Sequence, residues 1–203
     1  MKLSKKGEYA LRSLINLGIA AEMKRKLVQV SELAESEQLP VKFLEQILQA
    51  LKEAGIVASQ RGKFGGYRLA RPASKIKIGE VVRLIDGPLA PIGCVSQTAY
   101  EPCTCPDEAH CGLRMLMVDV RNAIAEILDR YTLADVVEIT LRKMRRDSVA
   151  LPFSTDGDAA GASPRVPARI ARQQLARRSR TPRESRTSPS EGVLHHILGE
   201  YSI

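Results

Sequence analysis

The 203-residue sequence has no tryptophan, only 4% aromatic residues and no run of about 18 consecutive apolar residues. Without such a run, no segment is expected to span a membrane. The N-terminal residues MKLSKKGEYALRS carry charge where a secretory signal would have its apolar core. We therefore expect a cytoplasmic protein, and its hydrophobic fraction of 44% is sufficient for a buried core.

Enzyme signatures are also missing from the sequence. No CxxC motif follows a predicted strand, no glycine-rich phosphate loop precedes a helix, and no cofactor fingerprint occurs. The serine, histidine and aspartate residues form no hydrolase motif. The sequence therefore predicts a protein that is not an enzyme.

The net charge of +8 is unevenly distributed along the chain. Residues 1–71 contain thirteen Lys and Arg residues against seven acidic ones, whereas residues 72–151 contain ten against eleven. Residues 152–190 contain eight arginines and three acidic residues. The basic N-terminal third predicts a polyanionic partner, and charge alone would allow DNA, RNA or an acidic protein.

Apolar periodicity predicts three helices in the first part of the chain. Residues 5–23 form the first, which Ser4 can cap, and Ser31 is placed to cap a shorter second helix. Residues 38–40 then form a turn into a third helix, for which Gly55 is a C-terminal cap. Two short helices joined by a tight turn indicate a helix-turn-helix motif. The apolar residues of the third helix recur at helical spacing: Leu44, Ile47, Leu48 and Leu51.

A glycine-rich hairpin follows the third helix. Residues 56–59 and 67–70 are predicted strands, and the letters RGKFGG lie between them. The glycines let the backbone approach a phosphate closely, and two cations supply charge. An ordinary exposed hairpin is the alternative, but the preceding helix-turn-helix pattern favours a wing that binds DNA. The candidate DNA-binding residues lie on the polar face of the third helix and on this wing: Lys42, Glu45, Gln46, Gln49, Arg61 and Lys63.

All four cysteines fall within residues 93–112, at positions 94, 103, 105 and 111. The segment contains Pro102 and Pro106 and is followed directly by an apolar helix, so we expect a loop that forms a chemical site. In a reducing compartment, clustered cysteines favour metal or redox chemistry over structural disulfides. Their thiolates suit an iron–sulfur cluster, zinc or a metal-free thiol switch, although the close spacing of residues 103 and 105 is atypical of zinc sites.

A long helix is predicted to start at Leu113, beyond a short helix over residues 78–85. Such a helix packs against another one, either within the same small domain or in a homodimer. Because two-fold symmetric operators need two DNA-binding domains, we favour the homodimer. Thr132 begins a capping motif for a last helix that ends near residue 145. The apolar residues of the long helix form a nearly heptad seam: Leu113, Leu116, Met117, Val120, Ile124, Ile127, Leu128 and Tyr131.

The predicted fold is mainly α and has five segments. Residues 1–71 form a winged helix-turn-helix domain with a small two-stranded wing, and residues 72–92 form a connector with a short helix. Residues 93–112 are a cysteine-rich sensor loop, and residues 113–146 comprise the long dimerisation helix and the closing helix. Residues 147–203 form a low-complexity basic tail that we expect to be mostly disordered, and its arginines favour weak non-specific DNA affinity over a purely solvated extension.

The motifs LSKKGEYALRSL, VKFLEQILQALKEAGIV, SQRGKFGGYRLA and IGEVVRLIDG, followed by the cysteine loop and TLADVV, occur in this order. Over about residues 1–146 the sequence thereby resembles the Rrf family of winged helix-turn-helix transcriptional regulators. The resemblance implies a homodimer crossed through the long helix, with the recognition helix in the major groove of double-stranded operator DNA and the wing in the minor groove. It implies that Glu45 and Gln46 read bases and that Arg61 enters the minor groove.

In cluster-binding relatives, three cysteines of this loop and a variable non-cysteine ligand hold an iron–sulfur cluster. The resemblance implies Cys94, Cys105 and Cys111 as ligands here, and a [2Fe–2S] cluster ahead of zinc. We therefore expect a repressor whose operator affinity depends on the cluster or on the redox state of the loop. The alternative is a metal-free thiol-switch or small-effector-responsive regulator of the same fold. The competing candidates for the remaining ligand place are Cys103, Glu8 and His110.

Overall fold

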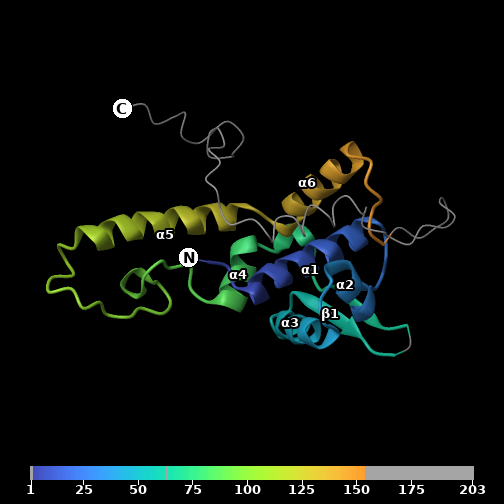
Figure 1. Ribbon diagram of the computed structural model, residues 1–203, viewed down its shortest axis with the longest axis horizontal. Helices are drawn as coiled ribbons and strands as arrows, with labels where there is room; N and C mark the ends of the chain where they lie inside the picture. Colours follow the sequence, from blue (N-terminus) through green and yellow to red (C-terminus); the bar gives the residue numbers. More distant parts are fainter. Residues whose placement is uncertain (1, 63, 154–203) are drawn as a thin grey trace, which may run out of the picture. The chain divides into compact units, whose positions relative to one another are not determined.

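The computed structural model describes residues 2–62 and 64–153. Over these residues the chain forms six α-helices, two short 3₁₀ helices and one antiparallel pair of strands (Figure 1). The mainly α fold with a two-stranded wing is therefore confirmed. Most of the predicted disordered tail, from residue 154 onward, lies outside the described residues. The elements are α1 (Lys5–Glu22), α2 (Val30–Glu37), α3 (Val41–Glu53), β1 (Val57–Gln60), β2 (Gly66–Leu69), η1 (Ala73–Lys75), α4 (Ile78–Asp86), η2 (Gly93–Val95), α5 (Gly112–Arg130) and α6 (Leu133–Arg146).

Helix α1 lies at the centre of the described fold. It begins as predicted behind Ser4, whose Oγ accepts the backbone N–H of Gly7 at 2.9 Å. Helices α2, α3, α4 and α6 and strand β2 all pack against α1. Leu14 and Leu17 are buried in this main core together with apolar side chains from each of the surrounding helices except α5. The remaining elements are thus positioned relative to α1.

The helix-turn-helix consists of α2 and α3. Gln38 joins them in the left-handed backbone region, with φ of 54°. The apolar stripe predicted for α3 is confirmed, since its four leucine and isoleucine residues are fully buried. The predicted cap at Ser31 is wrong, because the N-cap residue of α2 is Gln29, two residues earlier. There the carboxylate of Glu32 accepts the backbone N–H of Gln29 at 2.9 Å, which satisfies an otherwise unpaired donor.

Strands β1 and β2 form the wing and are tied to the rest of the domain by a short bridge. Their register pairs Val57 with Leu69 and Gln60 with Gly66. Val28, in the linker between α1 and α2, exchanges two backbone hydrogen bonds with Tyr67 of β2, at 3.0 and 2.8 Å. A Cβ at Gly66 would lie 2.5 Å from the carbonyl oxygen of Val28, so only glycine allows this close approach.

The apolar seam of α5 is partly covered within the chain and partly exposed. Near its C-terminal end, Ile124, Leu128 and Tyr131 pack onto a small core formed by α4 and the following loop, so this part of the predicted seam lies within the chain. At its N-terminal end, by contrast, Leu113, Met115 and Leu116 are each more than half exposed. The seam therefore does not face a single partner along its whole length.

Helix α6 closes the described fold. The predicted capping motif is confirmed, since Thr132 Oγ1 accepts the N–H of Asp135 and the Asp135 carboxylate accepts the N–H of Thr132. Leu133, Val137 and Leu141 then bury the inner face of α6 in the main core. Among the described helices, none is long and apolar enough to cross a membrane.

Candidate functional site

The outer face of α3 carries the polar residues that were predicted to contact DNA. Lys42, Glu45, Gln46 and Gln49 are all exposed, because the buried stripe of the helix faces the main core. The Gln49 amide donates to the Glu53 carboxylate at 2.7 Å. The first three side chains make no hydrogen bond or ion pair within the described chain, which leaves their polar groups available to a partner.

A surface hollow of about 390 Å³ lies between this helix and the wing. The N-terminal residues of α2, the C-terminal part of α3 and both arms of the hairpin line it, including Ser31, Lys52, Ser59 and Arg61. The sequence placed Arg61 in the DNA-binding set but not the serines, whose contribution depends on how α2 and the wing approach each other. Hydroxyl, ammonium and guanidinium donors facing one hollow can contact the phosphate backbone of a nucleic acid.

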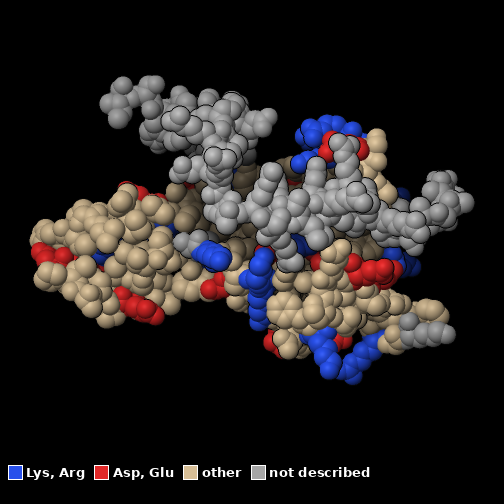
Figure 2. All heavy atoms as spheres, in the orientation of Figure 1, with Lys and Arg blue, Asp and Glu red and all other residues tan. Residues whose placement is uncertain are grey.

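Positive charge gathers on this part of the molecule. Figure 2 shows Lys and Arg side chains along its lower edge, over the region of α3 and the strands. Arg61 is exposed at the start of the hairpin loop. The neighbouring candidate Lys63 lies outside the described residues. The electrostatic character of the surface fits the predicted polyanionic partner.

All four cysteines line a second hollow, of about 220 Å³, beside the N-terminus of α5. Cys94 is buried on η2, Cys103 and Cys105 follow in the loop, and Cys111 is the N-cap residue of α5. The sulfur atoms of Cys105 and Cys111 lie 3.9 Å apart. The structure thus brings together the three cysteines predicted first, and it adds Cys103 to the same hollow.

The environment of each thiol shifts its pKa in a definite direction. The backbone N–H of Arg114, at the positive end of α5, lowers the pKa of Cys111 by bonding to its thiolate. Burial raises the pKa of Cys94. Hydrogen bonds from Cys105 to Cys103 and then to Cys111 raise the pKa of Cys105 to about 12. Cys111 therefore loses its proton more readily than Cys94 or Cys105.

Polar contacts hold the loop against α5. Tyr100 donates its hydroxyl to the carboxylate of Glu108 at 2.7 Å, and Arg114 of α5 forms an ion pair with the same carboxylate at 3.0 Å. Further along α5, the Arg121 guanidinium donates to the carbonyl oxygen of Val95 at 2.6 Å. The residue directly after Cys94 is therefore held by the same helix for which Cys111 is the N-cap residue.

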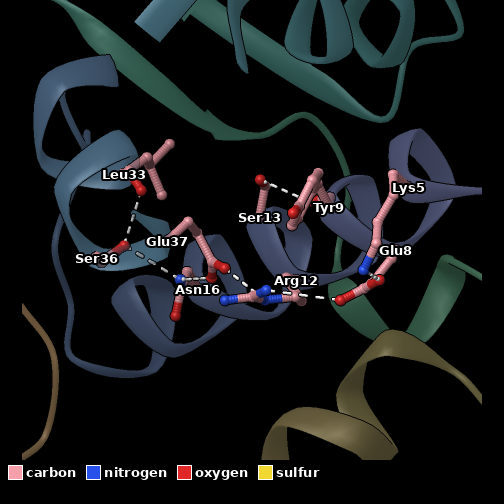
Figure 3. A network of polar contacts seen from close by, with 9 residues as sticks. All are labelled: Lys5, Glu8, Tyr9, Arg12, Ser13, Asn16, Leu33, Ser36 and Glu37. Carbon is pink, nitrogen blue, oxygen red and sulfur yellow. Dashed lines mark hydrogen bonds and ion pairs between the residues drawn. The ribbon is translucent and has the colours of Figure 1, made fainter. Parts of the chain in front are cut away.

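The two predicted non-cysteine ligands lie outside the cysteine hollow. His110 is 83% exposed and its Nδ1 lies 2.6 Å from the Asp107 carboxylate. Glu8 lies on α1, where hydrogen bonding to Lys5 lowers its pKa. Figure 3 shows Glu8 in a chain of polar contacts that continues through Arg12 to Glu37 on α2. Within one described chain, neither residue is brought to the sulfur atoms.

A carboxylate that the sequence reasoning missed does line the hollow. Glu101 contributes to its wall together with the four cysteines, and its backbone N–H donates to the Gly93 carbonyl at 3.2 Å. Only its position inside the cysteine window hinted at this role. In the part of the chain that the structure describes, no three His, Cys, Asp or Glu side chains converge on a point that would hold a single metal ion.

The helix-turn-helix, its wing and the exposed polar face of α3 define a winged DNA-binding transcriptional regulator. The chain belongs to the Rrf2 family, described as iron-dependent transcriptional regulators, which it matches over residues 3–139. The resemblance inferred from its motifs is therefore confirmed, and the chain is not an enzyme. It is 41% identical over 139 residues to an rrf2-like HTH-type transcriptional regulator of Rhodobacter capsulatus, which covers 66% of this chain and 91% of that relative.

Two solved structures extend this similarity to the fold. CymR, the global cysteine regulator of B. subtilis, has a TM-score of 0.57 at 31% identity, covering 68% of this chain and 98% of CymR. IscR of T. potens has a TM-score of 0.54 at 29% identity, covering 74% of this chain and 93% of IscR.

The pKa shifts predict the order in which the thiols of the reduced, metal-free protein react. Alkylation requires the thiolate, so we expect Cys111 to be modified by iodoacetamide at a lower pH than Cys94 or Cys105. Peptide mass spectrometry after brief treatment at increasing pH measures this order. Because Cys105 is exposed, its slow reaction would reflect its raised pKa and not its access. Modification of Cys105 before Cys111 would contradict the prediction.

Proposed function

We propose that this DNA-binding regulator acts as a homodimeric repressor whose operator affinity is set by its cysteine loop. The observation that carries the proposal is that all four cysteines line one hollow at the N-terminus of α5. The same helix packs on α4, which in turn packs on the central helix of the DNA-binding domain. A chemical change at the cysteines therefore acts on α5, which is connected through α4 to the DNA-binding domain. The proposed setting is the cytoplasm, where thiols stay reduced.

The proposed DNA contacts divide into base reading and backbone contacts. Glu45 and Gln46 are assigned to base edges in the major groove, since a glutamine amide can pair with adenine and a carboxylate can accept from cytosine. Lys42, Gln49 and Arg61, with Lys63, are assigned to the phosphates and the minor groove. Their exposure and the hollow beside them support this assignment for the described members of the set.

Homodimer formation is proposed through the N-terminal half of α5. The exposed apolar side chains of Leu113, Met115 and Leu116 lie close together in sequence on this helix. Exposed apolar groups of this size lower the free energy when a second surface covers them. A second copy of the chain is the partner that a two-fold symmetric operator requires, since each half-site needs its own DNA-binding domain.

The donor set of the loop fits an iron–sulfur cluster. Two thiolates bound tetrahedrally at about 2.3 Å from one metal ion lie about 3.8 Å apart, and the Cys105 and Cys111 sulfurs are separated by 3.9 Å. A cluster spreads its ligands over more than one iron, which suits cysteines that surround a hollow without converging on a point. We assign Cys94, Cys105 and Cys111 as ligands, and Cys103 as a candidate for the remaining ligand position. When bound, the cluster would supply redox and iron sensitivity.

A metal-free thiol switch is the second candidate, and the same pair of sulfur atoms favours it. Cys105 and Cys111 can form a disulfide by giving two protons and two electrons to a peroxide. The thiolate form of Cys111 provides the nucleophile for this reaction. Both candidates place the signal at the N-terminus of α5, so they share the mechanism that alters DNA binding.

The DNA assignment predicts two different mutational effects. Gln46→Ala should cost about 1–3 kcal/mol in operator binding and relax the preference at one base pair. Lys42→Gln should instead weaken binding to all sequences and reduce the salt slope by about one. Fluorescence anisotropy with operator and scrambled duplexes at several salt concentrations separates the two. Arg142→Gln on the exposed face of α6 is the control, and an unchanged Gln46→Ala affinity would contradict base reading.

The dimer assignment predicts that Leu116→Glu makes the protein monomeric. A carboxylate buried in an apolar interface would lose its hydration without gaining a partner, whereas in the monomer the 56% exposed position tolerates it. Sedimentation velocity measures the mass, and circular dichroism checks that the helices remain. Val41→Glu, an apolar-to-acidic change on α3, should leave the dimer intact. A Leu116→Glu protein with the mass of the wild type would rule out this interface.

The cysteine assignment predicts a visible-range chromophore after anaerobic reconstitution with iron and sulfide. Cys94→Ala and Cys111→Ala should each lose this absorption together with bound iron, whereas His110→Ala should keep both. If no chromophore forms and peroxide instead produces an intramolecular disulfide detectable by mass spectrometry, the thiol switch replaces the cluster. An operator footprint that is identical in all these states would exclude control by the loop.

A further inference from the structure

Helices α4 and α1 each have a glycine that allows a carboxylate of a neighbouring helix to approach closely. In α4, a Cβ at Gly79 would lie 2.1 Å from Oδ1 of Asp129 on α5. In α1, a Cβ at Gly7 would lie 2.5 Å from Oδ2 of Asp86 at the end of α4. Any larger residue at either glycine would displace the carboxylate, so both contacts require glycine. The same arrangement therefore links α5 to α4 and α4 to α1.

The contact between α5 and α4 is fixed in direction as well as distance. The guanidinium of Arg83 donates two parallel hydrogen bonds to the two carboxylate oxygens of Asp129, each at 2.7 Å. The Arg83 hydrogen bond lowers the pKa of Asp129, and the same bond raises the pKa of Arg83. A bidentate contact restricts the rotation of α4 against α5, which a single hydrogen bond would not do.

The contact between α4 and α1 lies at the C-terminal residue of α4, Asp86. The Asp86 carboxylate accepts the backbone N–H of Ser4 at 2.9 Å and also the Ser4 hydroxyl. Ser4 in turn caps α1 through the N–H of Gly7. A carboxylate at this position is also favoured by the positive end of the α1 dipole. A movement of α4 would therefore pull directly on the first turn of α1.

At its other end, α5 is joined to the cysteine loop. The Arg121 guanidinium bonds the carbonyl of Val95, the residue after Cys94, and Cys111 caps the helix. The described contacts consequently run without a break from the cysteine loop through α5 and α4 to α1. Helix α1 packs against both helices of the helix-turn-helix. The links from α5 to α4 and from α4 to α1 are polar contacts between helices, so a displacement of α5 can reach α1.

We propose that Asp129 and Asp86, held by Arg83 and Ser4, are positioning residues that transmit the state of the cysteine loop to the DNA-binding domain. The inference rests on the proposed function, because it presupposes that the loop controls operator affinity. It adds the route by which the control is exerted. Neither carboxylate belongs to the proposed DNA contacts or lines the cysteine hollow, so the effect of replacing them should fall on the coupling between the two sites.

The test compares operator affinities of the full-length protein in two states of the loop. One state is reduced and metal-free, and the other is either reconstituted with iron and sulfide or oxidised with peroxide, whichever changes the wild-type affinity more. Asp129→Asn, Arg83→Gln and Asp86→Asn should reduce the ratio of the two dissociation constants by about two- to thirtyfold. Gly79→Ala should do the same by displacing Asp129. Glu126→Gln, which removes an ion pair with Arg130 on α5, is the matched control and should keep the wild-type ratio.

The outcomes distinguish the route from the proposed function. If the wild-type protein has the same operator dissociation constant in both states, the loop does not control DNA binding. The proposed function and the proposed route are then both wrong. If the wild type responds and the Asp129 and Arg83 variants keep its full ratio, the route is wrong and the proposed function stands. If these variants weaken binding equally in both states, or only lower the melting temperature, the carboxylates have a structural role and the inference is overturned. A reduced ratio with unchanged binding in one state supports it.

Discussion

The central position of α1 is the constraint on which the rest of the described fold depends. The reading helices, the wing, the connector helix and the closing helix all pack against it. Its surface is shaped for close approach, since Gly7 admits the Asp86 carboxylate and Gly18 lies against the Val137 side chain. A helix that makes no proposed DNA contact therefore sets the position of the helices that do. It also packs against α4, which in turn packs against α5 beside the cysteines.

The two candidate sites differ in how their polar groups are satisfied. On the DNA-binding face, Lys42, Glu45 and Gln46 have no partner within the described chain, so their hydrogen-bonding capacity is available to a ligand. At the cysteine loop, by contrast, Glu108 and Arg121 already hold the backbone and side chains in place. This division suits a regulator, because a recognition surface must exchange water for its target while a sensing site must be preorganised.

Local patterns in the sequence were sufficient for most of the fold. The α3 stripe, the hairpin and the Thr132 cap follow from spacing and short-range hydrogen bonds, and the structure agrees with each. The division of the α5 seam could not be predicted, because an apolar periodicity does not say which neighbour covers which turn. The same holds for Asp129, whose partner Arg83 lies on another helix and 46 residues away in sequence. Glu101 lies in an irregular loop, where no periodicity predicts which side chains face the cysteines. In the cysteine loop, clustering predicted the site but not the hydrogen bonds that set the pKa of each thiol.

The hydrogen bond between Tyr100 and Glu108 gives the cysteine loop a spectroscopic probe. A phenol that donates to a carboxylate absorbs and emits differently from one in water, and this contact also raises the pKa of Tyr100. The chain contains five tyrosines and no tryptophan, so no indole emission masks the phenolic signal. Arg114 binds the same carboxylate from α5, which means that a loop leaving the helix alters the surroundings of the ring. The protein thus carries an intrinsic ultraviolet reporter next to its sulfur atoms.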